Sequence, residues 1–143
     1  MTTFKHILVT ALIAAGLAFA AGCQHIVLDS TGKNIGAFNY GEFSGLFNTT
    51  AIVVAPATHD AIKRLGLVEV AVTTSPQKFD SLIIARDEND LEVTIRIEEV
   101  NSRQTALRIR WGRGGDLQRS IQLYNLVDAA ISSSQTTAPR VAR

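Results

Sequence analysis

The chain has 143 residues, with 14 basic and 13 acidic side chains and a formal net charge of +1. This balance excludes the basic surplus with which proteins neutralise nucleic-acid phosphates. Aromatic residues make up only 6% of the chain, so it is poorly supplied with stacking platforms for bases or sugars. We therefore expect no nucleic-acid partner, and the length suits a single small domain.

An apolar run occupies the N-terminus. One basic residue, Lys5, precedes sixteen uncharged residues that run from Ile7 to Gly22 and lead to the only cysteine, Cys23. A helix needs about 20 apolar residues to cross the hydrocarbon core of a bilayer, so this run is short for a transmembrane helix. The small residues at its end indicate instead a cleaved secretory signal peptide over residues 1–22.

Two cleavage sites fit this segment. Ala18–Ala20 has the Ala-x-Ala pattern of a conventional secretory site, whereas Ala20–Cys23 resembles the lipobox of bacterial lipoproteins. The lipobox resemblance implies that Cys23 becomes the first residue of the mature protein and carries acyl chains. Position 20 is Ala where Leu is commonest in that pattern. Acylation is favoured because an exported lone cysteine must otherwise stay free or pair with another chain.

Acyl chains on Cys23 would make the membrane a partner of the protein. Each buried methylene contributes about 0.8 kcal/mol, so two or three chains together hold a protein on a bilayer. By analogy with the sorting rules of enteric bacteria, Gln24 rather than Asp after the cysteine predicts a periplasm-facing protein of the outer membrane. The inner membrane is the less favoured alternative.

The mature chain divides into three parts by composition. Residues 23–39 have mixed polarity and are predicted to be a lipidated tether, with one strand-like stretch at His25–Leu28. Residues 132–143 are polar and low in complexity, and are predicted to be a disordered tail. The folded domain is expected over residues 40–131.

The first half of this domain reads as a strand followed by a helix. Glu42–Phe47 has strand composition, and apolar residues at helical spacing then form one face. Thr49 or Thr50 can cap this helix, and Gly66 can end it in a left-handed conformation. Pro56 lacks an N–H, so the regular helix is expected to begin near Ala55, after a partly extended Ile52–Val54. The apolar face of the helix consists of Val54, Ala57, Ala61, Ile62 and Leu65.

The second half reads as four strands and a helix. Alternating or continuous apolar residues predict strands, and turn-forming residues at 87–90 and 101–104 predict hairpins between them. A last helix is expected from the N-cap Asp116 to about Ser132. The order β-α-β-β-β-β-α predicts an α+β two-layer sandwich, with an antiparallel sheet of four to five strands and two helices on one face. The four predicted strands lie at Val68–Thr73, Ser81–Ala85, Leu91–Glu98 and Leu107–Trp111.

Together these features resemble a family of short bacterial lipoproteins known only as a domain of unknown function. The resemblance implies an exported, lipid-anchored α+β domain and supplies no catalytic residues. Ala55 and Pro56 depart from the family's pattern, which has a large aromatic and an acidic residue there. The matching stretches are Val54–Leu67 with Val70, Ser81–Arg86, Leu91–Ile95, and Trp111–Asp116 with Ser120.

Few residues offer chemistry. Gly112–Asp116 has the form of a phosphate cradle, but Asp116 stands where an anion would sit, so a capping turn is the preferred interpretation. His59 is expected to be solvent-exposed, and no Cys or His lies at a useful spacing for a metal site. Ser120 lacks the glycine elbow of a nucleophilic serine. We expect no cofactor, no metal and no enzymatic activity.

Carboxylates at 92, 98 and 99 could form an acid–base pair, but cross-strand ion pairs on a wet sheet face are the simpler interpretation. That face is the candidate surface for an envelope protein partner. We expect a structural or protein-interaction accessory, and the alternative is a small-ligand-binding module with a pocket between sheet and helices. The predicted interaction surface consists of Glu92, Thr94, Arg96, Glu98, Arg108 and Arg110.

Overall fold

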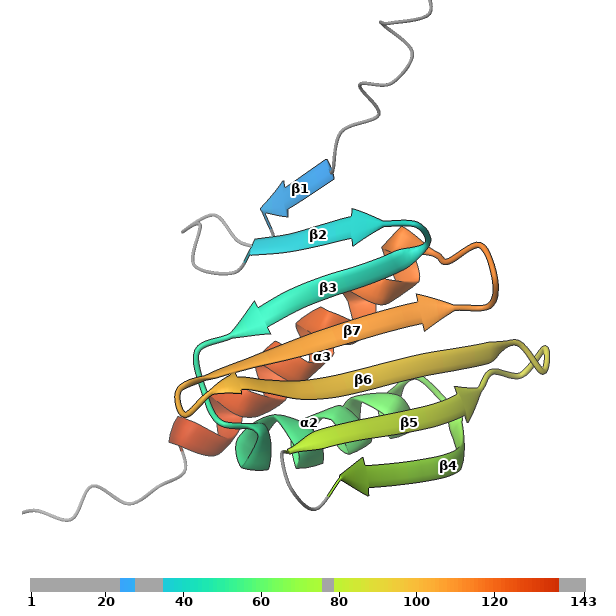
Figure 1. The fold of residues 1–143 in the computed structure, drawn as a ribbon. Helices are drawn as coiled ribbons and strands as arrows, with labels where there is room; N and C mark the ends of the chain where they lie inside the picture. The colour runs from blue at the N-terminus through green and yellow to red at the C-terminus, as the bar shows by residue number, and fades with distance from the viewer. Residues whose placement is uncertain (1–23, 28–34, 76–78, 137–143) are drawn as a thin grey trace, which may run out of the picture.

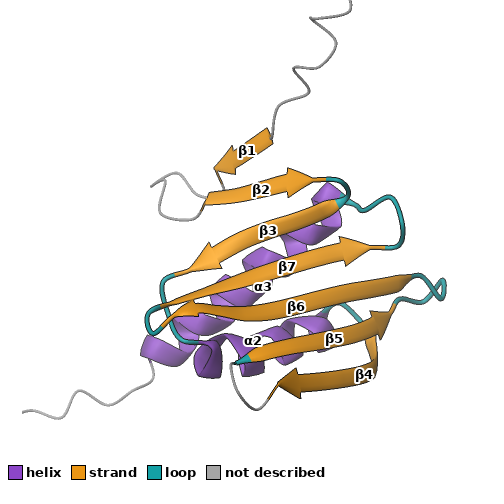
Figure 2. Cartoon of the chain, in the orientation of Figure 1, coloured by secondary structure: helices purple, strands orange, loops and turns teal. Residues whose placement is uncertain are grey.

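A computed structural model of the chain describes residues 24–27, 35–75 and 79–136. Its described part is a seven-stranded antiparallel sheet with helices α2 and α3 packed on one face (Figures 1 and 2). The predicted two-layer α+β sandwich is confirmed, with more strands than expected. The elements are β1 (Gln24–Val27), β2 (Ile35–Asn39), β3 (Glu42–Phe47), α2 (Ala51–Arg64), β4 (Val68–Ser75), β5 (Asp80–Arg86), β6 (Glu92–Asn101), β7 (Gln104–Trp111) and α3 (Leu117–Thr136), and the strand order is β1-β2-β3-β7-β6-β5-β4.

The two additional strands, β1 and β2, come from the segment that the sequence assigned to a tether. β2 pairs with β3, and β1 pairs with β2, so residues 24–27 and 35–39 extend the sheet. The strand-like stretch predicted at His25–Leu28 corresponds to β1, whereas β2 was not predicted, so residues 24–27 and 35–39 are part of the sheet and not of a tether. Tyr40 and Gly41 form a two-residue hairpin turn that pairs β2 with β3.

Helix α2 begins at Ala51, earlier than predicted, and includes Pro56. Proline removes the hydrogen bond to the carbonyl four residues earlier, here that of Ile52. Both Pro56 and Ile52 lie on the exposed side of the helix, where water can hydrate that carbonyl. Four residues of the predicted apolar face are buried and Leu65 is partly buried, and Gly66 (φ 69°) ends the helix as expected.

Strand β4 departs from the predicted pattern of one buried and one wet face. Its three valines are all exposed, and β4 is the edge of the sheet. A bulge between Glu69 and Ala71 shifts the register, so the alternation of the sequence does not map onto one face. Val68 pairs with Arg86, whereas Val72 pairs with the buried Ile83, on the other face of the sheet.

The core lies between the sheet and the two helices and is centred on an aromatic cluster. The ring of Tyr124 stacks on Phe47 with centroids 4.4 Å apart and meets Phe43 edge-on at 5.6 Å. The Tyr124 hydroxyl donates a 2.9 Å hydrogen bond to the carbonyl of Leu46, which satisfies its buried polar end. This close fit requires Gly45, because a Cβ there would overlap with the Tyr124 ring.

Helix α3 begins as predicted and ends later. The carboxylate of Asp116 accepts a 3.0 Å hydrogen bond from the Arg119 N–H and caps the helix. The helix continues to Thr136, so the first residues of the predicted disordered tail, 132–136, are helical. The rest of that tail, 137–143, lies outside the described residues.

Candidate interaction surface

The sheet face opposite the helices, which we call the open face, gathers the six predicted surface residues. Residues directly opposite on neighbouring strands share a face. The register aligns Thr94 with Arg110 and Arg96 with Arg108, and Glu98 lies beside Arg108 on the same face. Glu92 lies on this face at the start of β6, opposite Arg86 of β5. The hairpin of β6 and β7 therefore brings the predicted set together.

A charged network crosses three strands of the open face. Nε of Arg108 lies 2.9 Å from Oε2 of Glu98, an electrostatic contact that lacks hydrogen-bond alignment. Glu42 of β3 lies within 3.7 Å of the guanidinium groups of Arg108 and Arg110. Glu42 was not among the predicted surface residues, because its pairing with β7 joins segments more than sixty residues apart. These groups are partly exposed, so each pair contributes little to stability.

Arg96 stands apart from this network. It is exposed, has no ion-pair partner among the described residues, and lies directly opposite Arg108. Like charges directly opposite on neighbouring strands are destabilising. No ion pair in the described structure therefore uses the charge of Arg96.

An apolar margin adjoins the charged part of the open face. Leu82 and Ile84 of β5 are half-buried. On β6 they pair with Arg96 and Thr94, respectively, and on β4 Ile84 pairs with Ala71. The open face thus offers charge on β3, β7 and β6 beside apolar side chains on β5 and β4. Such a mixture is typical of non-obligate protein interfaces, which are about as apolar as the rest of a protein surface.

The glycine-rich segment after β7 acts as a capping turn. The N–H of Gly115 donates to the carbonyl of Trp111, and the carboxylate of Asp116 accepts from the N–H of Arg119 in the first turn of α3. Ser120 is fully buried and donates to the carbonyl of Asp116. These interactions agree with the preferred interpretation of a capping turn.

A side-chain stack that the sequence did not predict joins this segment to the turn between β5 and β6. The guanidinium of Arg119 lies 3.9 Å from the ring centre of Trp111, and its Nη1 donates to Oδ2 of Asp87 at 2.9 Å. The other carboxylate oxygen of Asp87 accepts from the N–H groups of Asn89 and Leu91. Arg119 therefore covers Trp111 and fixes the neighbouring turn.

The Asp87 carboxylate should make stability depend on pH. The hydrogen bond from the Leu91 N–H, with help from Arg119, lowers the pKa of Asp87 below its usual value. A lowered folded-state pKa stabilises the fold above the unfolded pKa of about 3.9, and this contribution is lost as the pH falls through the folded pKa. We expect the stability difference between wild type and Asp87→Asn in urea unfolding to be largest at neutral pH and to shrink in acid. A difference that does not change with pH would contradict this assignment.

His59 has a partner that the sequence did not predict. Its Nδ1 lies 2.6 Å from Oε1 of Glu69, and both side chains are only partly exposed. The prediction of a simply solvent-exposed histidine is therefore wrong. The sequence does not show that α2 packs beside β4. The bulge after Glu69 places this residue on the helix side of the sheet, where it pairs with the buried Ala85.

The carboxylates weighed for acid–base chemistry do not form a pair. Glu92 and Glu98 are six residues apart on one strand, or about 20 Å at 3.3 Å per residue. Glu99 pairs with the buried Thr105, and the alternation of the strand puts it on the face opposite to Glu98. Among the described residues, no group of three or more His, Cys, Asp or Glu side chains could hold a metal ion.

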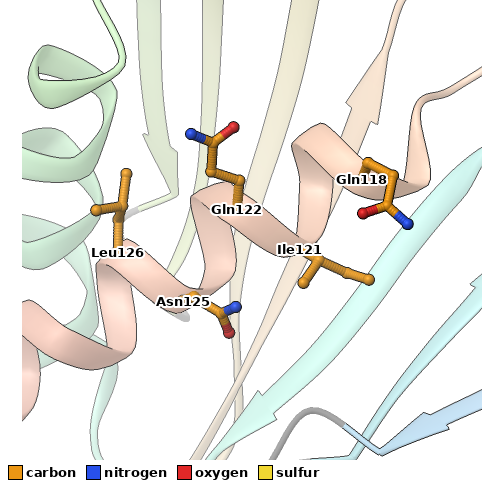
Figure 3. A pocket seen from close by; sticks show the side chains of 5 residues that line it. All are labelled: Gln118, Ile121, Gln122, Asn125 and Leu126. Carbon is orange, nitrogen blue, oxygen red and sulfur yellow. The ribbon is translucent and has the colours of Figure 1, made fainter.

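An open hollow runs along the outer side of α3 (Figure 3). Its residues all come from this helix, and only Ile121 and Leu126 add apolar side chains that also pack against the core. It does not lie between the sheet and the helices. Its lining residues are Gln118, Ile121, Gln122, Asn125 and Leu126.

Cys23 itself lies outside the described residues. Within the part of the chain that the structure describes, no helix is both long enough and apolar enough to cross a membrane.

These features define an α+β domain with helices on one face of an antiparallel sheet and a mixed charged and apolar surface on the other. The chain belongs to the family described as "Protein of unknown function (DUF3568)", whose profile matches residues 6–130. No curated protein matches the chain.

Proposed function

We propose that the protein is a lipid-anchored protein of the bacterial envelope, held on the periplasmic side of the outer membrane by acyl chains on Cys23. The observation that carries this proposal is the sequence Ala20–Cys23 at the end of an apolar run too short to span a bilayer. The family match begins at residue 6, so residues 6–22 of the leader and Cys23 lie within the matched region. The match therefore supports the interpretation that a leader of this kind is shared by members of the family.

On this anchor the domain acts as a structural or protein-interaction accessory without catalytic activity, and its open face is the contact surface. Arg96 supports this role, because its charge is exposed, unpaired in the described structure and opposed by Arg108. The partner we infer is an envelope protein with a polar surface that carries carboxylates opposite Arg96. Leu82 and Ile84 would supply the apolar part of the contact.

Crosslinking in intact cells, followed by mass spectrometry, tests the contact surface. We expect Arg96→Glu to abolish the crosslinks of the wild-type protein. The same substitution should leave the fold intact or stabilise it by about 0.2–1 kcal/mol, since Glu opposite Arg108 replaces a like-charge pair.

Arg103→Glu is the matched control, because Arg103 is exposed in the turn between β6 and β7 and its substitution changes the charge equally. This variant should keep the crosslinks. Identical crosslinks in the wild type and in Arg96→Glu would show that the open face is not the contact surface.

The alternative of a small-ligand-binding module gains no support from the core. The hydroxyls of two buried threonines already donate hydrogen bonds within the fold: Thr58 donates to the Val54 carbonyl and Thr105 to the Thr49 carbonyl. A ligand pocket needs convergent polar groups that remain available. We therefore favour the interaction role.

A further inference from the structure

The position of β1 determines where an anchor on Cys23 would meet the domain. Gln24 is the first residue of β1 and pairs with Phe38, near the end of β2. Cys23 is joined to Gln24 by one peptide bond, so their Cα atoms are about 3.8 Å apart. An acylated Cys23 would therefore be separated from the first strand of the sheet by a single peptide bond.

The turn between β2 and β3 lies at the same end of the sheet as the start of β1 (Figure 1). Its first residue, Tyr40, is 90% exposed and has a φ of 48°. Asn, Asp or Gly occupy such a turn position without strain, whereas a bulky residue with positive φ is unusual. The chain thus holds an aromatic side chain in solvent at a position where the fold prefers a small polar one.

The loop that follows β7 is fixed against this turn. A Cβ on Gly41 would collide with the backbone of Gly114, and a Cβ on Gly115 would collide with the backbone of Gly41. Arg113, the neighbour of Gly114, is exposed and has no ion-pair partner among the described residues. We call Tyr40, Gly41, Arg113 and Gly114 the N-terminal corner.

We propose that the N-terminal corner rests against the phospholipid bilayer, with Tyr40 in the interfacial region and Arg113 near the lipid phosphates. The proposal rests on the anchoring of Cys23 proposed above. Tyrosine is enriched at membrane interfaces because its ring is apolar and its hydroxyl polar, and arginine binds phosphate through several donors. The short connection to Cys23 keeps both side chains close to the lipid surface.

This contact has a consequence for the open face. The strands run from the N-terminal corner toward the opposite end, where α2 begins (Figure 1). A bilayer at the corner therefore meets the sheet at the ends of its strands and leaves the open face uncovered. The open face can then reach a partner held in the same membrane.

Tryptophan fluorescence tests the contact on the full-length protein, expressed, processed in cells, purified from membranes and reconstituted into liposomes. The liposomes contain phosphatidylethanolamine and phosphatidylglycerol with acyl chains brominated near the headgroup. We expect the emission of Tyr40→Trp to shift to the blue and to be quenched in these liposomes. Ile52→Trp is the matched control, because Ile52 is 75% exposed in the first turn of α2, which begins at the end of the sheet opposite the corner, and its emission should not change.

The wild-type protein supplies the background from Trp111, which is buried. Equal emission of Tyr40→Trp with and without brominated lipid, in protein that is bound to the liposomes, would overturn the membrane contact and leave the anchor intact. Failure of the wild-type protein to enter membranes or liposomes would overturn the anchor and, with it, the contact.

A second variant separates contact from folding. Tyr40→Asn, with Arg113→Glu, keeps a residue suited to the turn and removes both proposed lipid contacts. On liposomes, hydrogen exchange at residues 40–42 and 112–115 should be slower in the wild type than in this variant, while exchange in β6 stays equal. Equal protection at the corner in both proteins would contradict the proposal.

Discussion

Replacing Gly45 by alanine should destabilise the fold by about 3 kcal/mol, the upper part of the range for overpacked cores. The added methyl would overlap with the ring of Tyr124, which is fully buried and held between Phe43 and Phe47. The ring also donates its hydroxyl to the Leu46 carbonyl, so it cannot turn away without losing that hydrogen bond. A loss of this size lowers the melting temperature of a domain of about 100 residues by roughly 12–24 °C.

Gly114→Ala is the matched control, because a Cβ at Gly114 would meet nothing within 4 Å. Its melting temperature, measured by circular dichroism, should stay close to that of the wild type. In a Tyr124→Leu background the cost of Gly45→Ala should fall, since residues in contact have non-additive effects. If Gly45→Ala has the same melting temperature as the wild type, the close packing of β3 against α3 is not as described.

Cys23→Ala should move the protein from the membrane fraction to the soluble periplasmic fraction. The substitution removes the only thiol of the chain, and with it the site for the acyl chains. None of the described helices is long and apolar enough to cross a membrane. Fractionation of cells expressing wild type and variant, followed by immunoblotting, measures the shift.

The fold itself should not change, because residue 23 precedes the described sheet. Circular dichroism of the released variant provides the control. A properly processed Cys23→Ala protein that stays in the membrane fraction would contradict the lipid anchor.

The sequence predicted most of the central sheet because its strands alternate cleanly. β3 has the predicted bounds, and β6 and β7 bury the expected side chains, such as Ile95 and Ile109. The two faces of these strands differ strongly from each other in polarity, so the alternation of apolar and polar residues is visible in the sequence. The same regularity explains why the predicted surface residues come together on the open face.

The parts that were missed depend on long-range pairing or on local exceptions. β2 gains its stability from its neighbours in the sheet, not from its own short pattern. The bulge in β4 and the proline in α2 break local rules that tertiary packing overrides. Glu42 and Arg119 join the charged groups of distant segments, which one sequence does not reveal.

The most direct test of the lipid anchor is the mass of the N-terminal peptide of the protein isolated from membranes. We expect a peptide that begins at Cys23 and carries the added mass of a diacylglycerol on its sulfur and of a further acyl chain on its amine. A peptide that begins elsewhere, or an unmodified Cys23 in the mature protein, would contradict it.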